Sequence, residues 1–233
     1  MAELLLEVCV DSAEGLAAAV EGGADRIELC SALELGGLTP SAGLMRLAAG
    51  CGRPVLAMIR PRAGDFGFGA ADLAVMLEDI AAARAAGLAG VVLGATRGAA
   101  LDGGMLRRLV EAAAGMDLTL HHCFDLCADQ PAALEQAVAL GFRRVLSSGG
   151  AATAPEGAAV LDRLMRQAAG RIVVMPGSGV SADSLGALAA LPLAEVHGSC
   201  SVVAQESGFG FGGQRRTDAG RVRALKDALR RRA

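Results

Sequence analysis

Two short segments near the start of the chain each place a carboxylate two residues before a thiol. Glu7 precedes Cys9, and Glu28 precedes Cys30. If each segment is a β-strand, residues two apart share a face, so the acid and the thiol point the same way. Parallel neighbouring strands lie about 5 Å apart, so both acids and both thiols would crowd one small volume. Because burying unpaired charge is costly, we interpret this concentration as a functional site.

Other candidate residues follow later apolar stretches. Met58 and Arg60 follow one such stretch, and His121 and Asp125 follow another. Thiol and thioether sulfur atoms are candidate ligands of a soft metal ion. A histidine beside a carboxylate could instead move protons, while an arginine binds an anion. The structural alternatives are an inward Glu that pairs with Arg26 or Arg60, and sulfur-containing residues that only fill the core.

The elements that must position these residues form a regular alternation. Short apolar, β-branched segments alternate with Ala- and Leu-rich helical patterns eight times. Strands are predicted at 4–10, 24–30, 54–60, 88–94, 117–124, 143–148, 171–176 and 194–199. Helices are predicted at 12–22, 41–50, 70–86, 104–114, 131–140, 156–169, 182–190 and 218–231. Eight even units without a linker predict one α/β domain over residues 1–233, a (β/α)8 TIM barrel, rather than an open doubly wound sheet.

Alternation along the predicted strands assigns side chains to the barrel interior. The inward sets are Glu7, Cys9 and Asp11; Arg26, Glu28 and Cys30; Met58 and Arg60; Thr119, His121, Cys123 and Asp125; and Glu195, His197 and Ser199. His122 has the opposite parity and is predicted to face the helices or the surface. Barrel active sites lie at the C-terminal ends of the strands. The residues expected to converge there are Glu7, Cys9, Glu28, Cys30, Met58, Arg60, His121 and Asp125.

Two glycine-rich turns follow late predicted strands and could bind an anion. They contain Ser148, Gly149 and Gly150 after the sixth strand, and Gly177 and Gly179 after the seventh. Backbone N–H groups in such turns can cradle a phosphate, to which Arg60 or Arg62 would add charge. Alternatively, the glycines only permit tight turns.

Composition limits the classes of function. The net charge of −3 and a pI of about 5.7 argue against nucleic acid or an anionic membrane as the main partner. No apolar run approaches the ~18 residues of a membrane helix, and the N-terminus has no basic region, so neither a membrane span nor a signal peptide is predicted. The six cysteines are expected to be thiols of a cytoplasmic protein rather than disulfides. The glycine-rich stretch 201–216 is either a lid or a flexible connection.

Five sequence phrases, in order along nearly the whole chain, resemble the CutC copper homeostasis family. They are Glu7-Val-Cys-Val-Asp-Ser12, Gly23-Ala-Asp-Arg-Ile-Glu-Leu-Cys-Ser31, Gly36-Gly-Leu-Thr-Pro-Ser41, Met58-Ile-Arg-Pro-Arg62 with Gly64-Asp-Phe66, and Met175-Pro-Gly-Ser-Gly-Val180. The resemblance implies a cytoplasmic, self-associating (β/α)8 barrel that handles copper, with Cu(I) ligated by Cys9 and Cys30. This chain departs from the family in reading His121-His-Cys-Phe-Asp125 for His-Arg-Ala-Phe-Asp, and in having Phe68 for Tyr and Ser184 for Asn.

Two functional hypotheses from different classes follow. In the first, the chain is a copper homeostasis protein that binds Cu(I) through Cys9 and Cys30, with Met58 or Cys123 as a third ligand. In the second, it is a barrel enzyme that acts by acid–base chemistry on a small anionic metabolite, for example a phosphorylated one. The catalytic residues would then be Glu28, Arg60, His121 and Asp125, while Arg62 and the two glycine-rich turns would hold the anion.

Overall fold

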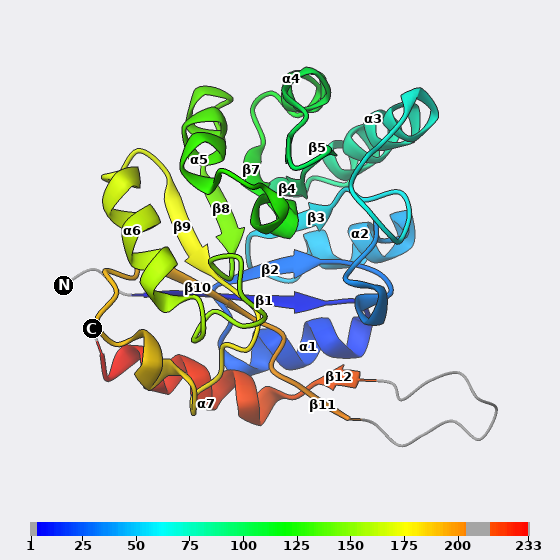
Figure 1. Ribbon diagram of the computed structural model, residues 1–233. Helices are drawn as coiled ribbons and strands as arrows, with labels where there is room; N and C mark the ends of the chain where they lie inside the picture. Colours follow the sequence, from blue (N-terminus) through cyan, green and yellow to red (C-terminus); the bar gives the residue numbers. More distant parts are fainter. Residues whose placement is uncertain (1–3, 204–214, 233) are drawn as a thin grey trace.

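Eight parallel strands form the centre of the molecule (Figure 1). A computed structural model describes residues 4–203 and 215–232 of the chain. The barrel strands are β1 (Leu5–Val10), β2 (Arg26–Leu29), β3 (Val55–Met58), β4 (Gly90–Leu93), β7 (Asp117–Leu120), β8 (Arg144–Ser147), β9 (Val173–Pro176) and β10 (Glu195–Gly198). Each strand lies within the range that the sequence predicts for it. The largest difference is in β7, which ends four residues before the predicted end at 124.

The strand order β10-β1-β2-β3-β4-β7-β8-β9 follows the chain, so successive strands are neighbours and the last strand returns to the first. β9 and β10 share no backbone ladder, but they lie side by side. A methyl group on Gly177, directly after β9, would lie 3.5 Å from Cβ of His197 in β10. This contact between β9 and β10, which we call the seam, nearly closes the (β/α)8 barrel that the sequence predicts.

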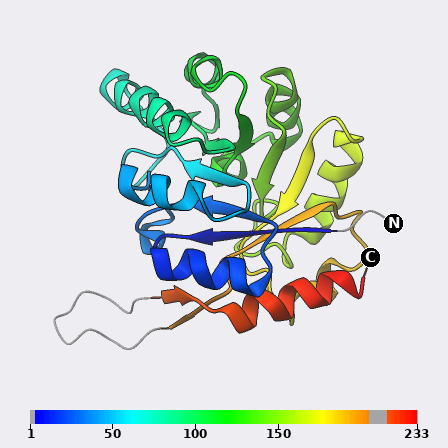
Figure 2. The same cartoon turned by 180° about the vertical axis from the view of Figure 1, so that it is seen from behind.

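Helices cover the outside of the barrel. They are α1 (Ala13–Gly22), α2 (Ala42–Ala49), α3 (Ala70–Ala85), α4 (Gly103–Ala112), α5 (Gln130–Ala139), α6 (Ala158–Ala168) and α7 (Ala219–Arg230). Predicted caps form as expected: Ser12 accepts a hydrogen bond from the N–H of Gly15, and Gly23 ends α1 in the left-handed conformation. Seen from behind, α1 and α7 lie side by side (Figure 2). No helix of the described residues is long and apolar enough to cross a bilayer.

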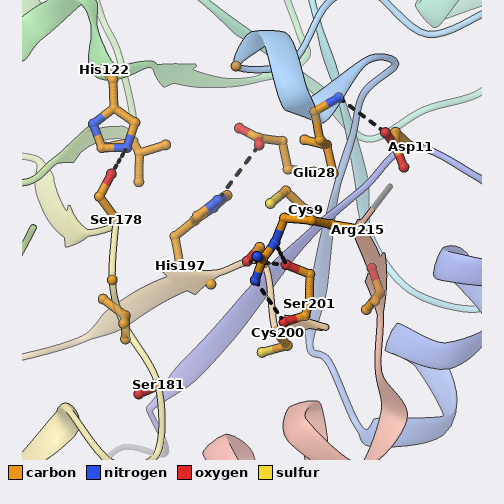
Figure 3. A pocket seen from close by; sticks show the side chains of 18 of the residues that line it. Cys9, Asp11, Glu28, His122, Ser178, Ser181, His197, Cys200, Ser201 and Arg215 are labelled. Atoms are coloured by element: carbon orange, nitrogen blue, oxygen red, sulfur yellow. Dashed lines mark hydrogen bonds and ion pairs between the residues drawn. The ribbon is translucent and has the colours of Figure 1, made fainter. Parts of the chain in front are cut away.

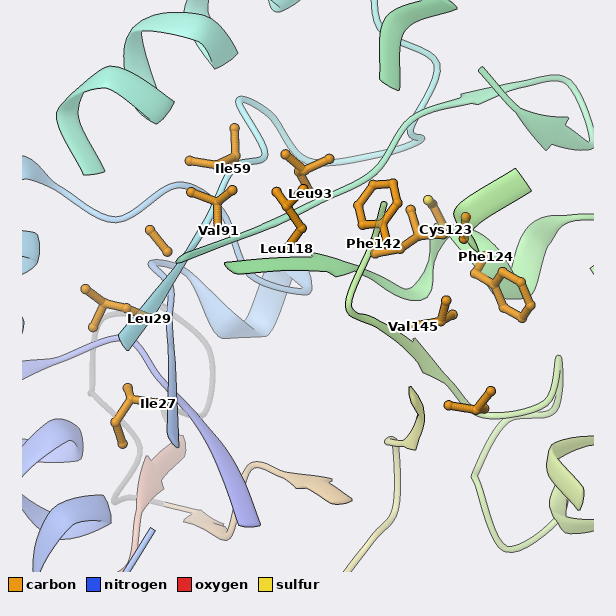
Figure 4. Close-up of a cluster of buried hydrophobic side chains, with 14 of the residues drawn as sticks. Ile27, Leu29, Ile59, Val91, Leu93, Leu118, Cys123, Phe124, Phe142 and Val145 are labelled. Carbon is orange, nitrogen blue, oxygen red and sulfur yellow. The ribbon is translucent and has the colours of Figure 1, made fainter. Parts of the chain in front are cut away.

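Apolar side chains divide into an outer and an inner cluster, as the strand parity predicts. The outer cluster fills the space between strands and helices; Figure 4 shows Ile27, Leu29 and Val91 among its members. The inner cluster consists of Cys30, Leu56, Met58 and Val92. The rest of the buried polar interior includes Glu7, Arg26, Glu28, Thr119, Arg144 and His197. A barrel interior with so few aliphatic residues is unusual and directs attention to the polar groups.

The structure departs from the predicted elements after β7 and after β9. After β7 the chain turns at His121 into a 3₁₀ helix, η2 (His122–Leu126), instead of continuing as a strand. The helix predicted at 182–190 is only a short 3₁₀ helix, η3 (Leu185–Leu188), since Gly186 weakens a helix and Pro192 follows closely.

Three further short elements, which the sequence did not predict, accompany the barrel. A 3₁₀ helix, η1 (Leu33–Leu35), follows β2. Two small hairpins are formed by β5 (Thr96–Arg97) with β6 (Ala100–Leu101), and by β11 (Ser201–Val203) with β12 (Arg215–Thr217). The glycine-rich stretch 201–216, for which the sequence left a lid and a flexible connection open, therefore begins and ends in a hairpin, and its residues 204–214 lie outside the described part of the chain.

Candidate functional site

A network of buried ion pairs forms the floor of the barrel interior. The guanidinium of Arg26 bonds to the carboxylates of Glu7 and Glu195. Arg144 donates to Glu195 at 3.0 Å and to Asp117 at 2.9 Å. Pairing between an inward Glu and Arg26, one of the structural alternatives raised by the sequence, is therefore present for Glu7. This network keeps the lower interior charged but paired.

The strand register decides which polar residues meet above this floor. Cys9 of β1 is the register partner of Glu28 in β2, and Glu7 is the partner of His197 in β10. The two Glu-x-Cys segments are therefore offset by two residues and not aligned acid to acid and thiol to thiol. This offset brings Glu28 beside Cys9, and it places Cys30 farther along the barrel.

A thiol, a carboxylate and an imidazole meet just above the floor. Potential ligand atoms of Cys9, Glu28 and His197 all lie within 4.8 Å of one another, and all three residues are buried. Figure 3 shows the three side chains pointing toward a common centre. We call Cys9, Glu28 and His197 the CEH cluster. The candidate site residues taken from the sequence did not include His197, although its inward parity in the eighth predicted strand was a usable signal.

Glu7 orients the imidazole of this cluster. The distance from His197 Nδ1 to Glu7 Oε1 is 2.9 Å, and Nε2 lies 3.8 Å from Glu28 Oε2. Burial alone would raise the pKa of Glu7, but Arg26 and His197 lower it to about 2. An ionised Glu7 favours the proton on Nδ1 and leaves Nε2 directed at Glu28 and Cys9.

The electrostatics of the CEH cluster favour retained protons. Burial alone would lower the pKa of His197, but Glu28, Cys9 and Glu7 raise it well above its usual range. Burial raises the pKa of Glu28; His197 opposes this shift and Glu7 adds to it. A cation that enters the cluster would therefore have to displace protons, as metal ions do at thiol and imidazole sites.

Cys30 and Met58 lie beside the cluster and belong to the inner apolar cluster. Cys30 Sγ is 3.6 Å from Glu28 Oε2. The same carboxylate oxygen also lies near the imidazole of His197. Burial and the nearby Glu28 carboxylate raise the pKa of the Cys30 thiol well above its usual range. Cys30 is thus a protonated thiol at neutral pH.

A cavity of about 780 Å³ opens above the CEH cluster. Its lining includes all three members of the cluster together with Met58, Arg60 and His121. Among the described residues, three buried polar atoms of this lining have no hydrogen-bond partner: Glu28 Oε1, Arg60 Nε and His121 Nε2. Because buried polar atoms in native proteins are normally satisfied, these three atoms suit a polar ligand in the cavity.

His121 lines the cavity as predicted, but its neutral imidazole is poorly suited to accept a second proton. Burial, followed by the charges of Arg60 and His122, lowers its pKa to about 3. Its Nδ1 accepts the N–H of Cys123 at 3.2 Å, and its ring lies 4.7 Å from that of Phe66. His121 is therefore neutral at physiological pH and carries its proton on Nε2.

The predicted parity fails beyond His121, because β7 ends at Leu120 and η2 rotates the following side chains. Cys123 lies in the outer apolar cluster and does not line the cavity, so it is wrongly assigned as a third copper ligand. His122, predicted to face away, lines the cavity instead. Asp125 bonds to His122 at 2.7 Å rather than to His121.

The arginines predicted to hold an anion are engaged by the protein itself. Arg60 lines the cavity, but its two terminal guanidinium nitrogens donate to the carbonyl oxygens of Leu35, Gly37 and Gly64 at 2.9 to 3.1 Å, and only Nε has no partner among the described residues. Arg62 lies outside the cavity lining and pairs with surface carboxylates, the nearest at 3.0 Å. Arg62 is therefore not placed to hold a ligand in the cavity.

The backbone N–H groups of the first glycine-rich turn also bond within the protein. The N–H groups of Ser148 and Gly150 donate to the carboxylate of Asp125, and that of Gly149 donates to Ser147 Oγ. All three N–H groups predicted to cradle an anion thus have an acceptor within the chain. The second turn differs, since Gly179 lines the cavity and its N–H has no acceptor within the described residues.

The fold and the site define the class of protein: a (β/α)8 barrel whose mouth holds a thiol–carboxylate–imidazole cluster below a cavity. The family model of the CutC family matches residues 4–202. A family protein CutC of Sinorhizobium medicae is 57% identical over 98% of this chain and 97% of its own length. One of Chromobacterium violaceum is 42% identical over 97% of this chain and 98% of its own length. The chain belongs to the CutC family.

A solved structure agrees with this assignment. The putative copper homeostasis protein CutC of Streptococcus agalactiae has a TM-score of 0.80 and 32% identity, covering 84% of this chain and 98% of its own. A KDPGal structure, with a TM-score of 0.63 and 17% identity, covers 98% of this chain and 95% of its own. The second likeness shows the fold alone.

Proposed function

We propose that this chain binds Cu(I) at the CEH cluster, through Cys9 Sγ and His197 Nε2, as its part in copper homeostasis. The observation that carries the proposal is the approach of the three potential ligand atoms to within 4.8 Å of one another. Thiolate sulfur is a preferred ligand of Cu(I), and imidazole suits copper. The name of the Streptococcus agalactiae relative, a putative copper homeostasis protein, supports the choice of metal.

The surroundings of His197 support the same assignment. Glu7 accepts the Nδ1 proton, so the other ring nitrogen is the one available to an ion. Metal-binding histidines usually donate their other ring N–H to a carboxylate in this way. Removal of such a carboxylate typically lowers metal affinity by about 10–100-fold. Copper would supply no chemistry beyond its own binding; it is the cargo.

Cys30 adds to this proposed site but does not form its centre. The Cys30 thiol donates a hydrogen bond to the Glu28 carboxylate. Because its pKa is raised, the thiol must lose its proton before the sulfur can bind a metal ion. The sequence-based pair of Cys9 and Cys30 thus becomes, in this proposal, a pair of Cys9 and His197 with Cys30 as an additional thiol.

A Cu(I) titration against a competing chelator tests the proposal. Cys9→Ser and His197→Gln should each weaken binding by about 100-fold, whereas Cys30→Ser should weaken it by less. Cys51→Ser is the matched control, since Cys51 lies near Arg53 outside the cavity lining. If the Cys9→Ser/His197→Gln double variant binds as tightly as the wild type, the copper site lies elsewhere.

A second candidate, acid–base catalysis on a small anionic metabolite, is favoured by the cavity. An ion needs little of its 780 Å³, and the unpartnered atoms of Glu28, Arg60 and His121 suit a polar ligand. Thermal stabilisation of the protein by phosphorylated metabolites, in parallel with Cu(I), would test it. No rise in melting temperature with any metabolite would remove this candidate. Cytoplasmic location and self-association stay predictions.

A further inference from the structure

A second group of polar side chains lies in the cavity wall, apart from the CEH cluster. Ser178 Oγ lies 3.3 Å from His122 Nε2, and His122 Nδ1 lies 2.7 Å from Asp125 Oδ2. Ser178 and His122 both line the cavity, and Figure 3 shows this pair to one side of Cys9 and His197. A hydroxyl, an imidazole and a carboxylate in this order can activate the hydroxyl as a nucleophile.

Hydrogen bonds fix the Asp125 carboxylate in the position from which it can orient His122. It accepts hydrogen bonds from Ser147 Oγ at 2.6 Å and from two backbone N–H groups of the turn after β8, at 2.9 and 3.0 Å. Burial would raise the pKa of Asp125, but the hydrogen bonds from His122 and Ser147 lower it. An ionised Asp125 keeps a proton on Nδ1 of His122 and leaves Nε2 to accept the Ser178 proton.

The turn after β9 presents the serine to this histidine. Ser178 has a φ of 66°, in the left-handed region that few residues other than glycine adopt, and it lies between Gly177 and Gly179. A methyl group on Gly177 would come within 2.5 Å of Leu146 Cδ1 and 3.3 Å of His122 Nε2. Glycine at this position therefore lets the turn pack against His122, and strained backbone of the Ser178 kind concentrates at functional sites.

We propose that Ser178 is the nucleophile of a hydrolytic site for small carboxylic esters, with His122 as general base and Asp125 as the residue that orients His122. The cavity is of the size that holds a small organic molecule. Gly179 and Val180 also line it, and their N–H groups make no hydrogen bond within the described chain. These two groups are the donors available to a developing oxyanion.

The reaction needs only the ester, water and these side chains. Ser178 Oγ attacks the carbonyl carbon, and its proton passes to His122 Nε2. The tetrahedral intermediate breaks its bond to the alcohol oxygen, which takes the proton from His122. Water then attacks the acyl-serine and gives a proton to His122; the bond between Oγ and the acyl carbon breaks, Ser178 regains the proton, and a carboxylic acid leaves.

The test uses a fluorophosphonate probe and p-nitrophenyl acetate on the metal-free full chain. The wild type should be labelled on the peptide that contains Ser178 and should release p-nitrophenol. Ser178→Ala should abolish both signals, and His122→Gln should slow both by at least ~100-fold. Ser181→Ala is the matched control, since Ser181 is an exposed serine of the same cavity that contacts Ser184 and not His122. It should retain both signals.

Failure of this proposal is distinguishable from failure of the copper site. Ser178→Ala removes an exposed hydroxyl, so it should fold and bind Cu(I) as the wild type does, while Cys9→Ser should keep the fluorophosphonate label. Absence of label on Ser178 in the folded wild type would overturn the proposal. Equal labelling rates in the wild type and His122→Gln would overturn it as well, because the serine would then react without its base.

Discussion

One methyl group added at Gly177, directly after β9, tests the packing of the barrel interior beside the seam. In Gly177→Ala the new Cβ would lie 2.5 Å from Leu146 Cδ1, 3.3 Å from His122 Nε2 and 3.5 Å from His197 Cβ. The first distance is shorter than real contacts allow, so Leu146 must move within a packed interior. Overpacking of this kind costs about 1–3 kcal/mol. We expect the free energy of unfolding to fall by that amount in urea denaturation.

Gly186→Ala is the matched control for this substitution. Gly186 has no heavy atom within 4 Å of its added Cβ. Its replacement should leave stability unchanged or raise it by about 0.4–1 kcal/mol, because alanine restricts the unfolded chain. If Gly177→Ala is as stable as Gly186→Ala, Leu146 does not pack against Gly177 as the structure shows, and the position argued for the turn after β9 beside His122 is wrong.

Two further outcomes follow from the buried polar residues. The pKa of Glu7 falls from 4.5 to about 2 on folding, so in metal-free protein its ionisation contributes about 3 kcal/mol above pH 4.5, which is lost as pH falls toward 2. The stability difference between wild type and Glu7→Gln should therefore shrink from pH 6 to pH 3 in urea denaturation; a constant difference would contradict the ion pairing. Cys123→Ser should lower stability by about 1–3 kcal/mol, because it buries a hydroxyl in the outer cluster, and should leave Cu(I) affinity unchanged. A loss of Cu(I) affinity would return Cys123 to the site.

Alternation of residues predicted the barrel and much of its interior. The helix-facing positions Ile27 and Leu29 lie in the outer cluster, and Glu7, Glu28 and Cys30 are buried inside the barrel. Period-2 alternation carries this information because a strand packed between helices and a polar interior must place its two faces differently.

The register and the end of a strand could not be predicted in the same way. The offset that pairs Cys9 with Glu28 arises from the stagger of barrel strands, which depends on the closure of the whole sheet. The turn at His121 depends on hydrogen bonds such as the one from the N–H of Cys123 to the imidazole. The strand alternation does not hold beyond this turn. Extending it to His122 therefore placed this residue toward the helices instead of the cavity, and it missed the contacts of His122 with Asp125 and Ser178.

X-ray absorption at the copper edge of the Cu(I)-loaded protein identifies the atoms that ligate the ion. We expect sulfur from Cys9 together with an imidazole nitrogen from His197, and loss of the nitrogen contribution in His197→Gln. A spectrum with sulfur ligands alone, unchanged in His197→Gln, would show that copper does not bind at the CEH cluster.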